Sequence, residues 1–165
     1  MSSNALKQRS EVVRIEQFLK EVHIELKDSI KNLEDRELNW RPSQSSNSIG
    51  NLLKHILGSE AFWIHHIVGG LESQRIRASE FTIEDFNFKN LQNELIKTKR
   101  MTKKVLIELN DEQLSELRTY WSQLTNQHRE RTVYWCLMHS IEHSALHIGQ
   151  IFYIRRLFRD LIKRN

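Results

Sequence analysis

The chain has 165 residues, a hydrophobic content of 39% and a formal net charge of +4 at pH 7, which suits one domain, over residues 1–165, with a single core. Its 25 basic and 21 acidic residues are interleaved and no fingerprint of a DNA- or RNA-binding fold is present, so we do not expect nucleic-acid binding. A single cysteine, no secretory leader and no apolar run long enough for a membrane span together predict a cytoplasmic protein without a membrane anchor.

The pattern of apolar residues predicts an all-α fold. Only five glycines and one proline interrupt the chain, and long stretches carry apolar residues three and four positions apart. The first stretch predicts a helix over about residues 6–33. After Pro42 and a polar run, Asn47 or Ser48 suits the N-cap of a second helix that reaches about Val68, before two glycines end it.

Two further helices follow. The third is expected to begin between Thr82 and Asp85, where short polar and acidic side chains suit a helix start, and to reach about Leu109. After a polar connection, the fourth is expected over about residues 132–158. The similar hexapeptides LEDREL and LNDEQL each follow a long helix, which favours two helical hairpins. The sequence therefore predicts a four-helix bundle of long helices with two polar connections.

Two histidines lie one helical turn apart, His143 and His147, in the segment MHSIEHSALHIGQIF. At this spacing both imidazoles project from the same side of a helix and can reach one metal ion. The other residues on that side are apolar or small, so the pair is expected to face the bundle interior. Buried imidazoles need partners, and one divalent cation would satisfy a nitrogen from each. The pair therefore predicts a metal site.

A third candidate ligand is His55, in the segment SIGNLLKHILG. The helical positions around it carry small or polar side chains, including Asn51 and Ser59, which predicts a cavity rather than a sealed aliphatic core. A lone histidine is more often a hydrogen-bonded core residue than a ligand. His55 gains a predicted role in metal binding only from its context.

The segments SNSIGNLLKHILGSEAFW and EHSALHIGQIFYIRRL resemble the second-helix and fourth-helix motifs of the DinB-like superfamily, and LEDRELNWRP resembles the family's first connection. The resemblance implies a four-helix bundle, one divalent metal ion, usually zinc or nickel, and a homodimer. On this sequence the implied metal ligands are His55, His143 and His147. Many relatives have a further histidine directly before the last ligand. This chain has Leu146 there, so one possible auxiliary base is absent.

The resemblance also favours a type of reaction. Characterised relatives include bacillithiol-dependent transferases and mycothiol-dependent maleylpyruvate isomerases, which implies a metal-dependent S-transferase or isomerase that acts on a small electrophile with a low-molecular-weight thiol. Three imidazole ligands leave a coordination position open, as in catalytic zinc sites. Metal-dependent hydrolysis is an alternative, although HSALH lacks the glutamate of the HExxH pattern. A non-catalytic protein that binds metal or a small molecule is another alternative, and no catalytic residue is assigned.

Three side chains are candidates for binding a cosubstrate. Arg75 and Arg77, in RIRASEF, could bind carboxylates at the cavity rim, but a loop held by an Arg–Glu pair with Glu80 is the more ordinary explanation. Gln150 lies near the edge of the ligand side and could hydrogen-bond a metal-bound group or only pack there. His139 lies to the side of His147 and is not a predicted ligand.

Overall fold

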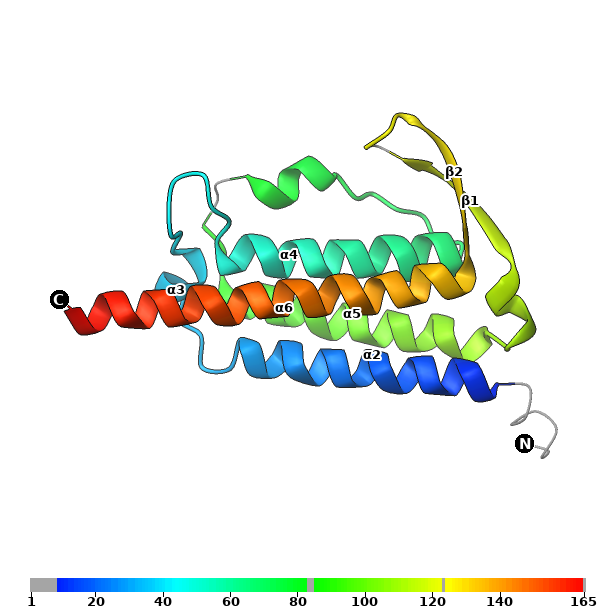
Figure 1. Cartoon of the computed structure of the whole chain (residues 1–165), viewed down its shortest axis with the longest axis horizontal. Helices are drawn as coiled ribbons and strands as arrows, with labels where there is room; N and C mark the ends of the chain where they lie inside the picture. The colour runs from blue at the N-terminus through cyan, green and yellow to red at the C-terminus, as the bar shows by residue number, and fades with distance from the viewer. Residues whose placement is uncertain (1–8, 83–84, 123, 165) are drawn as a thin grey trace.

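Four long helices form the body of the protein: α2 (Ser10–Ser29), α4 (Ile49–Glu60), α5 (Phe88–Glu108) and α6 (Val133–Arg164) (Figure 1). The structure is a computed structural model that describes residues 9–82, 85–122 and 124–164. Helix α6 packs against α2 and α4, and α5 packs against α4 and α2, which closes the bundle. The predicted all-α four-helix bundle is confirmed, with a two-stranded sheet in addition.

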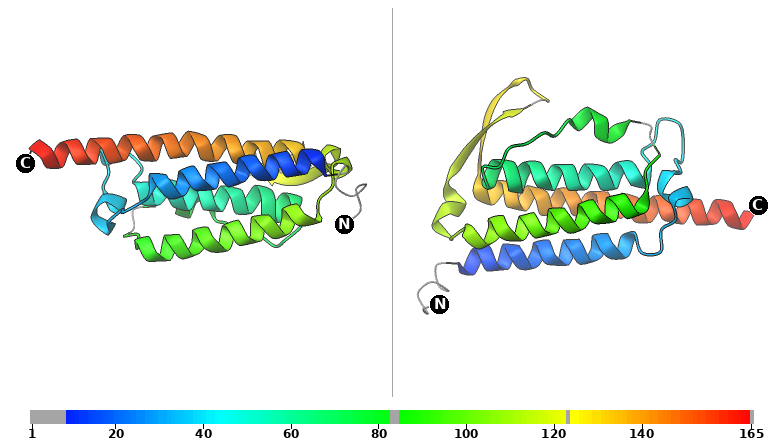
Figure 2. Two further views of the ribbon diagram at one scale, coloured as in Figure 1. Left: turned by 90° about the horizontal axis from the view of Figure 1, so that it is seen from below. Right: turned by 180° about the vertical axis from the view of Figure 1, so that it is seen from behind.

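The path of the chain differs from the two predicted helical hairpins. The colours of Figure 1 show that α4 and α5 run in the same direction, joined by a crossover between residues 69 and 87 that returns along α4. Helix α2 packs against α6 and α5 rather than chiefly against α4, the next long helix in sequence (Figure 2). The crossover contains a 3-10 helix, Arg77–Phe81, that packs on α4. The RIRASEF segment therefore lies against the helix that carries His55.

The first half of the chain follows the predicted boundaries closely. Helix α2 lies within the predicted residues 6–33, of which residues 6–8 lie outside the described residues. A short helix that the sequence did not predict, α3 (Asp35–Asn39), follows it. The Ser48 side chain accepts a hydrogen bond from the Asn51 backbone, and the Asn51 side chain accepts one from the Ser48 backbone. Ser48 is therefore the N-cap of α4, one of the two predicted residues.

The later boundaries differ in detail. Helix α4 continues as a π-helix, Ala61–Val68, so the helical segment ends where the glycines predicted it. Helix α5 begins at Phe88, after the predicted start, and Asn87 caps it by accepting from the Asn90 backbone. The intervening residues 83 and 84 lie outside the described residues. Helix α6 continues to Arg164, beyond the predicted end, and no described helix combines the length and hydropathy needed to cross a membrane.

A β-hairpin, rather than the predicted polar connection, occupies most of the segment before α6. Strand β1 (Leu117–Ser122) pairs antiparallel with β2 (Gln127–Thr132), and β1 packs on the π-helix. Asn126 has a positive φ of 51°, which asparagine tolerates better than most residues. The β-forming run Thr-Tyr-Trp in β1 was the available signal, although charged neighbours obscured it.

Apolar side chains from the four helices fill the bundle interior. Most of the apolar stripe predicted on α2 is buried, although Phe18 in that stripe is 54% exposed, and Cys136 and Leu137 are buried at the beginning of α6. Burial raises the pKa of the Cys136 thiol to about 11, so this cysteine is a thiol rather than a thiolate at neutral pH. The core thus fixes the spacing between α4 and α6, the two helices that carry the candidate ligands.

Candidate functional site

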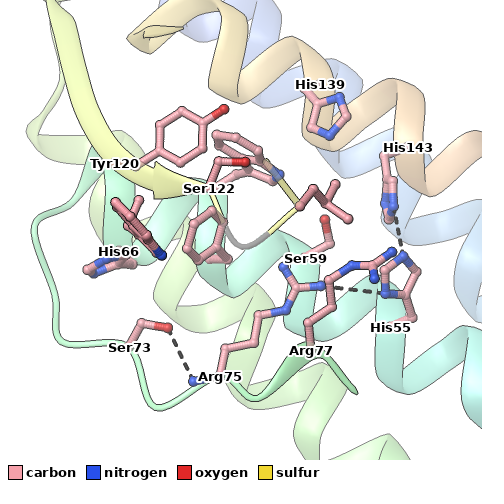
Figure 3. A pocket seen from close by; sticks show the side chains of 14 residues that line it. His55, Ser59, His66, Ser73, Arg75, Arg77, Tyr120, Ser122, His139 and His143 are labelled. Carbon is pink, nitrogen blue, oxygen red and sulfur yellow. Dashed lines mark hydrogen bonds between the residues drawn. The ribbon is translucent and has the colours of Figure 1, made fainter. Parts of the chain in front are cut away.

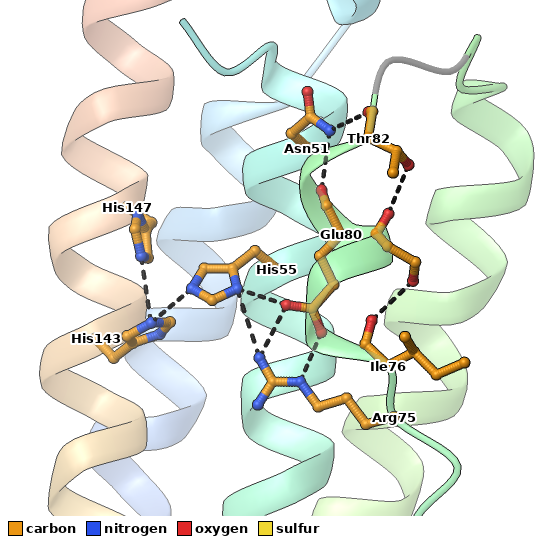
Figure 4. Close-up of polar contacts among 9 residues, drawn as sticks. Asn51, His55, Arg75, Ile76, Glu80, Thr82, His143 and His147 are labelled. Atoms are coloured by element: carbon orange, nitrogen blue, oxygen red, sulfur yellow. Dashed lines mark hydrogen bonds and ion pairs between the residues drawn. The ribbon is translucent and has the colours of Figure 1, made fainter. Parts of the chain in front are cut away.

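Three histidines converge where α4 faces α6 (Figure 4). The Nε2 atoms of His55 and His147 lie 3.0 and 3.2 Å from the Nε2 atom of His143. One ligand nitrogen from each residue lies within 4.8 Å of the other two. Among the described residues, no other group of histidine, cysteine and acidic side chains converges in this way. The structure thus brings together the three residues that the sequence analysis selected.

Hydrogen bonds orient the two outer imidazoles. The Nδ1 atom of His55 lies 2.7 Å from Oε2 of Glu80, and because a carboxylate only accepts, Nδ1 donates; in a neutral imidazole, Nε2 then keeps its lone pair. The Nδ1 atom of His147 lies 2.7 Å from Oε1 of Gln150, which accepts in the same way. Both residues therefore direct an unprotonated nitrogen towards the same point.

The central imidazole shows that the group fits a cation. His143 faces both lone pairs with Nε2, and its Nδ1 is buried without a hydrogen-bond partner among the described atoms. A neutral imidazole has one N–H, so His143 can donate to only one of the two facing nitrogens well. A divalent cation would accept a lone pair from all three residues. Imidazole donors suit zinc, nickel, copper and iron, so the two predicted metals are compatible with this donor set.

Glu80 is the main support of His55. Arg75 donates to it through both Nε and Nη2, at 2.6 and 2.9 Å, in a bidentate pair. Burial alone would raise the pKa of Glu80, but the hydrogen bonds from His55 and Arg75 hold this pKa below its ordinary value. Gly58 on α4 makes the arrangement possible, because a Cβ there would overlap the Glu80 carboxylate. Glu80 is therefore a carboxylate at neutral pH.

Glu80→Gln is expected to weaken zinc binding about 10- to 100-fold, because the amide lacks the charge that fixes and strengthens His55 as a donor. Competition with a chromophoric chelator measures the dissociation constant. Glu72→Gln, in the exposed part of the crossover, is the matched control. Equal dissociation constants for Glu80→Gln and the unaltered chain would show that the carboxylate does not support the site.

The surroundings of His143 and His147 lower the pKa of both imidazoles. Burial, followed by the neighbouring imidazoles of His147 and His55, lowers the pKa of His143 to about 3. Burial also lowers the pKa of His147, although the hydrogen bond to Gln150 opposes the shift. Metal ligation requires unprotonated imidazoles. His143 and His147 therefore meet this requirement at pH 7 without losing a proton.

The stability of the metal-free protein is expected to fall as the pH is lowered from about 6.5 towards 3. In this range the unfolded chain has a protonated His143, whereas the folded chain binds that proton only near its pKa of about 3. Urea unfolding at several pH values between 7 and 5 measures the slope of the free energy of unfolding against pH. His143→Gln should flatten it, and His128→Gln, on the exposed strand β2, should not. Identical slopes for the two variants would contradict the shifted pKa.

A cavity of about 470 Å³ opens beside the triad (Figure 3). His55 and His143 form part of its wall, together with Ser59 from α4. The sequence analysis predicted space around His55 but not the outer walls, which come from the π-helix and the missed hairpin. Their cavity-lining side chains are Phe62, Trp63, His66, Tyr120, Trp121, Ser122 and Leu124.

The structure distinguishes the candidates for cosubstrate binding. Arg75 and Arg77 both line the cavity, but Arg75 is the partner of Glu80, as the ordinary explanation predicted. Gln150 hydrogen-bonds the imidazole of His147. His139, which was not a predicted ligand, is a cavity residue whose ring stacks on Trp135 with 4.6 Å between centroids.

A second buried polar cluster connects α2, the end of α4 and α5, and the sequence analysis missed it. His23 contacts both carboxylate oxygens of Glu60 through Nε2, at 3.0 and 2.9 Å, and Thr102 donates a short hydrogen bond to the same carboxylate. His65 lies 2.9 Å from the Thr102 hydroxyl. Although burial opposes ionisation, the interactions with His23 hold the pKa of Glu60 below its ordinary value. An isolated glutamate in an otherwise apolar helix was the available signal.

Comparison with known proteins places the fold. The family model described as DinB superfamily matches residues 19–151. The structure resembles a DinB-like protein from Bacillus cereus (18% identity, TM-score 0.66, 85% of this chain and 89% of that one). It also resembles a conserved protein from Enterococcus faecalis (18% identity, TM-score 0.63, 87% of this chain and 94% of that one). A third similar structure is YfiT from Bacillus subtilis (17% identity, TM-score 0.68, 96% of this chain and 90% of that one). YfiT is described as a probable metal-dependent hydrolase with an unusual four-helix bundle topology.

The search of curated proteins found no match. Because the structural relatives are less than one-fifth identical in sequence, they show a shared fold rather than a shared reaction. The family model, in contrast, covers most of the chain and includes His55, His143 and His147. The chain therefore belongs to the DinB superfamily.

Proposed function

We propose that this chain is a metal-dependent enzyme that transfers a low-molecular-weight thiol to a small electrophile. The observation that supports the proposal is the convergence of three imidazole nitrogens, two of them from residues that line a 470 Å³ cavity, His55 and His143. A zinc or nickel ion held by three neutral ligands would lower the pKa of a thiol or water in its open coordination position. The cavity provides space for the electrophile beside that position.

His139 is suited to accept a proton in this reaction. Its ring lies 5.5 Å from the His143 ring, between centroids, and lines the same cavity. Burial lowers its pKa, so the imidazole is neutral at pH 7 and can accept the proton that a thiol loses. The stacked ring of Trp135 restricts its orientation. His139 thus provides a base on the substrate side of the triad.

The test is anaerobic incubation of the zinc- or nickel-loaded protein with a thiol panel, including cysteine and glutathione, and the electrophile monochlorobimane. The expected result is an S-conjugate, detected by mass spectrometry, that forms faster than in the uncatalysed reaction and disappears after chelator treatment. His139→Gln should slow the reaction without releasing the metal. If no thiol in the panel gives a metal-dependent conjugate, the transferase proposal is wrong.

Metal-dependent hydrolysis is the second candidate function. YfiT is described as a probable metal-dependent hydrolase, and its fold extends over 96% of this chain. A neutral His139 could also accept a proton from a water molecule whose pKa a bound metal had lowered. Metal-dependent cleavage of a chromogenic ester in the complete absence of thiol would favour this alternative.

We also propose that the chain forms a homodimer through α6. Leu146 and Tyr153 lie seven residues apart on this helix and are 63% and 54% exposed, so they offer an apolar face to a second copy. Leu146→Glu is expected to convert a dimer into a monomer in size-exclusion chromatography with light scattering. Ile96→Glu, at a site on α5 that is 64% exposed, is the matched control. A monomeric unaltered chain would contradict the proposal.

A further inference from the structure

The cavity beside the triad has an uneven charge. Its described lining residues include two arginines and no aspartate or glutamate. The bidentate pair with Glu80 balances the charge of Arg75. Arg77, in contrast, has no hydrogen bond or ion pair with any described residue. The cavity wall therefore carries one positive charge that no carboxylate of the described residues offsets.

Arg77 lies near the three histidines, with the Phe81 ring between its guanidinium and His55. Its guanidinium carbon lies 5.1 Å from the centroid of the Phe81 ring, and the Phe81 ring lies 4.8 Å from the His55 ring. Figure 3 shows the Arg77 side chain on the same side of the cavity as His55. The 3-10 helix of the crossover contains both Arg77 and Phe81. An anionic group on Arg77 would therefore place the rest of its ligand within reach of the triad.

The remaining walls of the cavity are largely aromatic. Trp63 forms edge-to-face contacts with Phe62 and Tyr120, at centroid distances of 5.1 and 4.9 Å. Trp121 lines the same cavity and is 48% exposed, so its ring has surface left to bury against a ligand. Aromatic side chains pack well against other flat rings, and the volume is within the range of small-molecule sites.

We infer that the cavity selects a flat aromatic carboxylate, whose carboxylate pairs with Arg77 and whose ring lies against Trp63, Tyr120 and Trp121. The guanidinium fork matches the two oxygens of a carboxylate, and the missing acidic partner leaves its donors available. This inference rests on the proposed function, because it takes the cavity as the substrate site. It requires no metal for the binding step itself.

The test is isothermal titration calorimetry of the full, chelator-treated chain with 2-naphthoate and with 2-naphthamide, which has a similar shape and no charge. The acid is expected to bind at least about tenfold more tightly than the amide. Arg77→Gln should reduce this ratio to about twofold or less, and Arg77→Lys should retain part of it, because lysine keeps the charge but not the fork. Arg100→Gln, on the exposed side of α5, should leave the ratio unchanged.

Three results would overturn the inference: equal affinities of the unaltered chain for acid and amide, a ratio that persists in Arg77→Gln, or binding of acetate as tight as that of naphthoate. Circular dichroism of each variant establishes that it is folded. The two proposals can fail separately. Naphthoate selectivity in a protein that binds neither zinc nor nickel would overturn the proposed function alone, and binding of either metal without naphthoate selectivity would overturn this inference alone.

Discussion

His147→Ala is expected to reduce the zinc content from about one ion per chain to almost none after dialysis against a weak chelator. The variant removes one of three converging lone pairs and leaves His55 and His143, whose Nε2 atoms are 3.0 Å apart. Two imidazoles hold a divalent ion far less tightly than three, and no described acidic or cysteine side chain lies in the group to replace the third. Elemental analysis by mass spectrometry measures the bound metal.

The matched control is His128→Ala, because His128 lies on exposed strand β2 and outside the triad. Its zinc content should equal that of the unaltered chain. Circular dichroism distinguishes loss of the ligand from loss of the fold. Full zinc content in a folded His147→Ala variant would show that the ion binds elsewhere.

Glu60→Ala is expected to lower the free energy of unfolding by about 1–3 kcal/mol, the range for leaving a buried hydrogen-bonding group without its partner. His23 and Glu60 are only 5% and 2% exposed, so removal of the carboxylate leaves the imidazole in the core without its partner. Thr102 loses its acceptor as well. Urea unfolding followed by circular dichroism measures the change, with Glu25→Ala on the exposed face of α2 as the control.

A double variant distinguishes the stability gained from the His23–Glu60 interaction from the cost of burying one of these residues without the other. If His23 and Glu60 stabilise the fold mainly by satisfying each other, His23→Leu combined with Glu60→Leu should destabilise the protein less than Glu60→Leu alone. A loss below about 1 kcal/mol in Glu60→Ala would instead indicate that water reaches the cluster easily.

The parts of the fold that depend on local sequence could be predicted. Helical periodicity predicted the stripe on α2 and the inward direction of His143 and His147, because side chains three and four residues apart share a face. The Ser48 cap is also a local signal, formed with a residue three positions later. The two candidate ligands on α6 could therefore be identified before any packing was known.

The parts that depend on topology could not. Periodicity does not show whether consecutive helices are packing neighbours, so the crossover and the parallel α4 and α5 remained hidden. The Glu80 support of His55 joins residues 25 positions apart, and the His23–Glu60 pair joins residues 37 positions apart. The sequence also placed Arg75 and Arg77 in one segment without indicating which arginine pairs with Glu80. Only the packed 3-10 helix distinguishes them.

The β-hairpin contributes to the shape of the cavity but not to the group of candidate metal ligands. It contributes Tyr120 and Trp121 to the cavity, whereas the candidate ligands and their supports Glu80 and Gln150 come from the helices and the crossover. Substitutions in β1 can therefore reshape one wall of the cavity without removing any donor of the histidine triad. In related bundles, selectivity for the small molecule in the cavity can therefore change while the three histidines stay the same.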